Sequence, residues 1–199
     1  MGTKKDSPNH TGLYQFAEQQ GGYFTARQAE QVGFTYPLLS RHAKTGRFIR
    51  VKHGIYRLAQ FPESPNADLF VAALELHGRG VFSHETALSL YELSDTLPSQ
   101  IHLTVPAQTS RRHPDLKLHT SRLARNEITQ RHELAVTTVP RTLADVIASG
   151  MAEEQVRLAV QQAVEHGLLS KASLQRYAKK RGGRMARIIT NVLSENTEQ

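Results

Sequence analysis

The first third of the chain changes from one hydrophobic period to another. Apolar residues recur three and four positions apart through residues 11–46, which is the spacing of one helix face. Three helices are expected there, and the segments "TGLYQFAEQQGG", "TARQAEQVG" and "YPLLSRHAKTG" each end in glycine. From residue 48 the pattern alternates around "KHG", which predicts a β-hairpin with Gly54 in its turn.

The second and third helices are joined by the short turn "GFT", a spacing typical of a helix-turn-helix. Thr25 and Gln28 are expected to form a capping box at the start of the second helix. Thr35 is expected to cap the third helix, which has a proline in its first turn. A hairpin directly after these helices forms a wing. We therefore predict a winged helix-turn-helix domain over residues 11–62, preceded by a disordered leader at residues 1–10.

The chain after residue 66 mixes both patterns. A polar, proline-containing linker, "FPESPNA", leads into it. Alternation predicts strands in "QIHLTVP", "DLKLHTSRL" and "ELAVTTV". Helical spacing predicts helices in "DLFVAALEL", in "HETALSLYEL" with Ser83 as its cap, and in four segments from Pro140 to about Ser194. The fold class is thus α+β: the winged helix-turn-helix domain is followed, over residues 66–199, by a mixed α+β domain with a small sheet and C-terminal helices.

The charge of the chain is distributed unevenly. The net charge is +7, and residues 1–62 hold nine Lys or Arg and three acids, against sixteen and fifteen in the remainder. A folded segment of one sign is typical of a polyanion-binding surface, most often for nucleic acid. A second stretch, His166–Ser194, has seven Lys or Arg and no acid. Three interpretations of this stretch stay open: a second nucleic-acid surface, a surface for an acidic partner protein, or a solvated helix pair.

The predicted third helix exposes a polar face opposite Leu39. In a helix-turn-helix, the N-terminal part of the second helix of the motif enters the major groove, where arginine pairs with guanine edges or phosphate. The wing tip is placed to touch the DNA backbone or the minor groove. The side chains on these two surfaces are Tyr36, Ser40, Arg41 and Lys44 of the helix and Arg50, Lys52 and His53 of the wing.

No catalytic or metal site is expected. The ten histidines are scattered, and neither "SHETAL" nor "RHEL" has the second histidine of a zinc-protease motif. Ser83 lacks the Gly-x-Ser-x-Gly turn of a hydrolase, and no phosphate-binding glycine loop occurs. The absence of cysteine, of a signal segment and of an apolar run of about 18 residues predicts a cytoplasmic protein without membrane contact. We predict a protein that is not an enzyme and has no cofactor.

The order of these segments resembles a known family. The segment "LLSRHAKTGRFIRVKHGIYRLA" is similar to the N-terminal domain of AbiEi-family antitoxins, the antitoxin-repressors of bacterial type IV toxin–antitoxin and phage abortive-infection modules. The similarity continues in "FSHETALSLYELSDTLPSQIHLTVP" and "VTTVPRTLADVIAS", and spans roughly residues 12–150.

The resemblance implies two activities and two partners. The winged helix would bind inverted repeats in the double-stranded DNA of its own promoter and repress the operon. The C-terminal domain would counter a cognate AbiEii-type nucleotidyltransferase toxin, with or without stable contact. Family precedent places DNA binding on the basic positions of the third helix and wing, which adds Arg47. With Thr35 at the helix start, the expected DNA-contacting set is Thr35, Tyr36, Ser40, Arg41, Lys44, Arg47, Arg50, Lys52 and His53.

Two other functions remain as alternatives. One is a stand-alone winged-helix regulator whose second domain binds a ligand or forms a dimer. The other is a nuclease, because a similar N-terminal region precedes a restriction-endonuclease-like domain in some bacterial proteins. Such a nuclease needs an acid followed by Glu-x-Lys, and no Glu-x-Lys occurs after residue 62. The sequence therefore favours a regulator over a nuclease.

Overall fold

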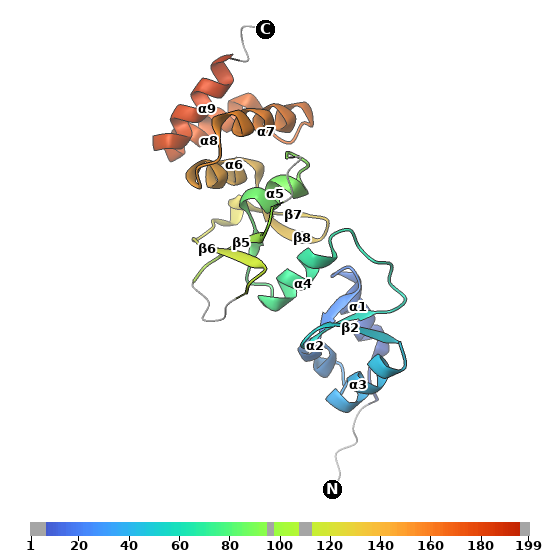
Figure 1. The fold of residues 1–199 in the computed structure, drawn as a ribbon. Helices are drawn as coiled ribbons and strands as arrows, with labels where there is room; N and C mark the ends of the chain where they lie inside the picture. Colours follow the sequence, from blue (N-terminus) through green and yellow to red (C-terminus); the bar gives the residue numbers. More distant parts are fainter. Residues whose placement is uncertain (1–6, 95–97, 108–112, 196–199) are drawn as a thin grey trace. The chain divides into compact units, whose positions relative to one another are not determined.

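The computed structural model describes residues 7–94, 98–107 and 113–195. The chain divides into two compact units, Met1–Arg79 and Gly80–Gln199, and both are drawn in Figure 1. Within the described ranges, no helix is both long and apolar enough to cross a membrane.

The first unit contains the expected helix-turn-helix and wing. Its helices are α1 (His10–Glu18), α2 (Ala26–Gln31), α3 (Tyr36–Lys44) and α4 (Ala67–Glu75). Its strands are β1 (Tyr23–Thr25), β2 (Phe48–Lys52) and β3 (Ile55–Leu58), paired antiparallel in the order β1-β3-β2. The capping box is present, since the Gln28 amide donates to the Thr25 hydroxyl and Gln28 Oε1 accepts from the Thr25 amide. Strand β1 was not expected, because three residues are too few to show alternation.

The wing turns at Gly54, whose φ of +72° is easily adopted only without a side chain. A bulge between Arg50 and Lys52 leaves Val51 without a partner in the ladder. Behind the hairpin lies one apolar core that joins the three helices to the sheet. Its buried members are Leu13, Ala17, Phe24, Ala29, Phe34, Leu39, Phe48, Tyr56 and Leu58.

Two boundaries of the first unit differ from the sequence prediction. Helix α1 already begins at His10, because Asn9 caps it: its side chain accepts from the Gly12 amide at 2.9 Å, and its own amide donates to the Val32 carbonyl at 2.8 Å. The leader predicted for residues 1–10 is therefore too long, and residues 1–6 of it lie outside the described part.

Helix α4 belongs to the first unit, although the prediction placed residues 66–199 together. It contacts β1 and β3, and the ring of Phe70 stacks on that of Tyr23 with centroids 6.1 Å apart. Gly21 makes this approach possible, because a Cβ there would lie 2.6 Å from the Phe70 ring. The boundary thus follows α4, and a linker composition alone could not show which side the helix packs on.

The second unit is built on a five-stranded mixed sheet. Its strands are β4 (Val81–Phe82), β5 (Ile101–Val105), β6 (Leu116–Thr120), β7 (Ile128–Arg131) and β8 (Leu134–Thr137), in the order β6-β5-β4-β8-β7. The pairs β5–β6 and β4–β8 are parallel, and β4–β5 and β7–β8 are antiparallel. The three predicted strands are present, and β4 and β7 join them.

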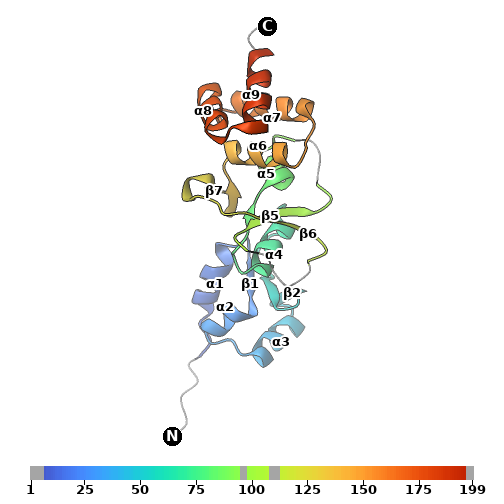
Figure 2. The same ribbon diagram turned by 90° about the vertical axis from the view of Figure 1, so that its left-hand side faces the viewer.

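Helices of the second unit gather on one side of this sheet, as the two views in Figures 1 and 2 show. They are α5 (His84–Leu90), α6 (Val139–Ala148), α7 (Glu153–Glu165), α8 (Lys171–Arg181) and α9 (Gly183–Glu195), with a 3-10 turn η1 at Arg125–Glu127. Helix α5 contacts both β5 and α6, and α6 in turn contacts α7, α8 and α9. The α+β architecture predicted from the sequence is confirmed.

Ser83 does not cap α5 in the way the sequence suggested. It stands at the N-cap position, but its side chain makes no capping hydrogen bond. The hydroxyl instead accepts from Thr104 Oγ1 at 2.9 Å and lies 2.9 Å from Nδ1 of His84. A buried partner on β5, Thr104, and the neighbouring His84 thus contact this hydroxyl, and the periodicity of α5 could not reveal them.

A buried arginine connects helices and loops of the second unit through hydrogen bonds. Arg141 on α6 is 3% exposed. Its guanidinium donates to Asp145 at 2.8 Å, to Glu127 of η1 at 2.9 Å and to Ser121 at 3.1 Å. Glu127 also accepts from the hydroxyl of Tyr177 on α8 at 2.8 Å. Burial raises the pKa of Tyr177 to about 12, and its hydrogen bond to Glu127 acts in the same direction.

Candidate nucleic-acid interface

The exposed face of α3 carries the charges that the sequence placed there. Leu39 is buried in the core, so Arg41 and Lys44 turn outward, and Arg47 follows the end of the helix. All three are exposed, and none has an ion-pair or side-chain hydrogen-bond partner among the residues that the structure describes. These cations are therefore available to a ligand without loss of an internal contact.

The start of α3 is polar and open. Tyr36 is 65% exposed, so its ring and hydroxyl are open to a ligand. Thr35 is the N-cap residue by backbone geometry, but contrary to expectation its hydroxyl makes no capping hydrogen bond. Ser40 is half-buried, whereas the other eight members of the expected set are exposed.

Two basic side chains of the wing have partners that the sequence did not indicate. Lys52 Nζ lies 2.8 Å from Glu75 Oε1 on α4, with side chains 44% and 19% exposed. Arg50 Nη2 lies 3.3 Å from His53 Nδ1. The segment between Glu30 and Glu63 contains no acid, but folding brings the carboxylate of Glu75 to the wing. Lys52 must therefore give up an ion pair before it can contact phosphate.

Glu75→Gln is expected to strengthen DNA binding by about fivefold. An exposed ion pair contributes at most about 1 kcal/mol, so loss of this pair lowers the cost of moving Lys52 to a phosphate by up to that amount. One additional phosphate contact would also steepen the salt dependence of log K by about 0.9. The measurement is a fluorescence-anisotropy titration of the full chain at several salt concentrations. Asp68→Asn, which removes the same charge from the exposed face of α4, is the control. Equal affinities of the two variants would show that Lys52 does not lie at the DNA.

His42 occupies the inner face of α3, where the sequence gave no signal for it. Its ring is 8% exposed and packs against Phe48, with centroids 4.7 Å apart, and near Phe34. Burial lowers the pKa of His42, and the neighbouring charges of Arg47, His10 and Arg41 lower it further. Helix α3 therefore packs on the core through an imidazole whose neutral form the fold favours.

Because the His42 ring is neutral, the packing of α3 against the core is expected to be sensitive to acid. The pKa of His42 in the folded chain lies below the 6.5 of an unfolded histidine, so the unfolded state binds more protons as the pH falls from 6.5 toward the folded pKa. The stability of α3 is expected to be complete above pH 6.5 and to decline below it. Histidine ring signals and α3 amide exchange, measured by NMR in the full chain, test this. His42→Phe should weaken the dependence, and a folded pKa of 6.5 or higher would contradict it.

A solved structure shares the fold of this chain. The chain is similar in fold to the RV2827C protein from Mycobacterium tuberculosis, whose crystal structure superimposes with a TM-score of 0.55. The two share 14% sequence identity, and the match covers 92% of this chain and 74% of the other. At this identity the likeness concerns the fold alone. No curated protein matches the chain.

The part of the chain that matches a protein-family model is the winged helix. The model of the AbiEi antitoxin transcriptional regulators matches residues 13–59, a segment that runs from within α1 to the end of the wing. The exposed cations of α3 and both wing strands lie inside it. Residues 13–59 of this chain are therefore similar to the AbiEi family of antitoxin transcriptional regulators.

Proposed function

We propose that the protein is an antitoxin of a bacterial type IV toxin–antitoxin pair and represses its own operon by binding inverted repeats in the promoter. The observation that carries the DNA-binding half is the set of exposed cations on and just after α3 of a winged helix, Arg41, Lys44 and Arg47, which have no side-chain partner among the described residues. The match of residues 13–59 to antitoxin transcriptional regulators supports the same function.

In this proposal α3 lies in the major groove. Arg41 pairs with a guanine edge or a phosphate, and Tyr36 and Ser40 hydrogen-bond to bases or backbone near the helix start. Lys44 and Arg47 contact phosphates, which fix the register without reading sequence. Arg50 and His53 of the wing contact the backbone or the minor groove. An inverted repeat would take two copies of the chain, one on each half-site.

The second half of the proposal concerns the toxin. The second unit, Gly80–Gln199, would counter a nucleotidyltransferase of the AbiEii type, with or without a stable complex. Its support is the antitoxin character of the family that residues 13–59 match. The exposed bases of α8 and α9 are the surface that this unit offers to an acidic partner, among them Arg176, Lys179 and Arg187.

Promoter binding is tested with the purified full chain and the DNA upstream of its own gene. Binding to that DNA should be much tighter than to a scrambled duplex of equal length. If about six cations meet phosphates, log K should fall with log salt at a slope near −5. Equal, weak binding to both duplexes would contradict the repressor role.

The antitoxin role is tested in cells that express the nucleotidyltransferase toxin with which the proposal pairs this chain. The full chain should restore growth, and so should Arg41→Ala/Lys44→Ala, because the proposal assigns neutralisation to the second unit. Promoter binding without rescue would instead favour a stand-alone winged-helix regulator. Loss of rescue in a stably folded double variant would place neutralisation on the DNA-binding face.

A further inference from the structure

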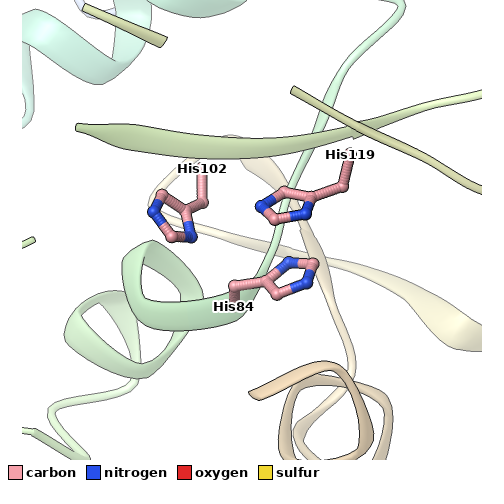
Figure 3. Close-up of side chains that lie close together, drawn as sticks. All are labelled: His84, His102 and His119. Atoms are coloured by element: carbon pink, nitrogen blue, oxygen red, sulfur yellow. The ribbon is translucent and has the colours of Figure 1, made fainter. Parts of the chain in front are cut away.

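Three histidines that are far apart in the sequence converge in the second unit. His84 stands at the start of α5, His102 on β5 and His119 on β6, and Figure 3 shows their rings facing one another. One ring nitrogen from each lies within 4.8 Å of the other two. The parallel register pairs His102 with Lys117, so His119, two residues further along, points to the same side of the sheet as His102.

The hydrogen-bond partners of these rings leave specific nitrogens for a ligand. Glu85 Oε2 lies 2.5 Å from His102 Nδ1, and neither buried atom has another partner among the described residues. Ser83 Oγ lies 2.9 Å from His84 Nδ1. The Nε2 atoms of His84 and His102 thus remain for binding. Nε2 of His119 is buried and has no hydrogen-bond partner within the described ranges, which is costly unless something fills its lone pair or takes its proton.

The backbone at His84 is left-handed, as it also is at His77, Glu92, His132 and Glu133. Its φ is +53°, in the left-handed region that residues with a Cβ rarely adopt. Backbone strain of this kind is concentrated at functional sites, where the surrounding structure holds it in place. Here it directs a buried imidazole toward the other two, although asparagine or glycine would occupy that conformation at lower cost.

We propose that His84, His102 and His119 bind a divalent transition-metal ion of the Zn²⁺ class. Imidazole nitrogen is a preferred ligand of Zn²⁺, and three histidines with one remaining position form a known tetrahedral arrangement. The contact from Glu85 to His102 is the carboxylate–histidine pair that orients a metal ligand and raises its basicity. The bound ion would cross-link edge strand β6, strand β5 and the start of α5.

Two further observations bear on binding. Burial lowers the pKa of His84 to about 3 and also lowers the pKa of His119. The His84 and His119 rings stack with centroids 3.5 Å apart and planes 14° apart. A metal lies in the plane of each imidazole that binds it, so one of these rings must turn. Nitrogens on one tetrahedral zinc are about 3.4 Å apart, so the cluster must also contract.

The test is a titration of Zn²⁺ into tag-free full chain that has been stripped with a chelator. Isothermal titration calorimetry should give one equivalent per chain, and Co²⁺ in the same site should show the visible absorption of tetrahedral coordination. The metal should raise the melting temperature, and a chelator should reverse the rise. No binding by the wild-type chain would overturn the proposal and leave the cluster as core packing.

Variants distinguish this site from the other histidines. His119→Gln should weaken Zn²⁺ binding at least about 100-fold. Glu85→Gln, which keeps all three ligands, should weaken it about 10- to 100-fold, because the orienting carboxylate is lost. His166→Gln, at an exposed histidine of the same unit, is the control and should bind like wild type. Unchanged affinity in both His119→Gln and Glu85→Gln, with circular dichroism showing intact folds, would overturn the site even if zinc binds elsewhere.

Discussion

Arg41→Ala/Lys44→Ala is expected to reduce the affinity of the full chain for its own upstream DNA by about 100-fold. Both side chains are exposed on α3 and have no partner among the described residues, so their loss changes the interface and leaves the fold intact. A specific arginine contact contributes about 1–3 kcal/mol, and about 1.4 kcal/mol is a factor of ten. The salt slope of log K should also become shallower by about 2, one for each lost cation.

A matched variant separates this effect from net charge. Arg176→Ala/Lys179→Ala removes two exposed cations from α8 and should leave promoter affinity within about twofold of wild type, because an exposed charge outside the contact is screened by salt. Anisotropy titrations at two salt concentrations measure all three proteins. Equal losses in both double variants would indicate diffuse charge attraction. A larger loss in the α8 variant would move the nucleic-acid surface to the C-terminal helices.

Arg141→Met is expected to lower the free energy of unfolding of the second unit by about 3–5 kcal/mol. Methionine fills similar space but leaves the buried carboxylate of Asp145 without its cation, and leaves the mostly buried Glu127 only the longer ion pair to Arg181, at 3.6 Å. Removal of one partner from a buried ion pair costs this much because the remaining charge keeps its desolvation penalty. The loss should be visible as a lower urea midpoint for the NMR signals of α6.

Neutral replacements of the two carboxylates should restore most of the stability that Arg141→Met loses. Arg141→Met combined with Glu127→Gln and Asp145→Asn leaves no buried charge, and replacement of whole buried ion pairs is often close to neutral. Arg176→Met, at an exposed position of α8, should change stability by no more than about 0.5 kcal/mol. A loss below about 1 kcal/mol in Arg141→Met would show that water reaches and solvates the two carboxylates.

The sequence by itself determined the local structure of the first unit. Helical spacing, the Thr25–Gln28 capping box and Gly54 at the hairpin turn act within a few residues, so their physical causes can be read from neighbouring positions. The outward face of α3 follows from the same period once Leu39 is assigned to the core. For these reasons the winged helix, and the exposure of its basic residues, follow from the order of residues alone.

Only the tertiary structure decided what depends on contacts between distant segments. It placed Glu75 beside Lys52, packed α4 on the first unit, and drew Arg141 into a network with Glu127 and Asp145. It also brought together three histidines that lie on two strands and a helix and share no sequence spacing. Strand register and helix packing set these distances, and no local period encodes them. The sequence therefore predicts which residues would meet DNA, and the fold shows which buried contacts join distant segments and which three histidines lie close together.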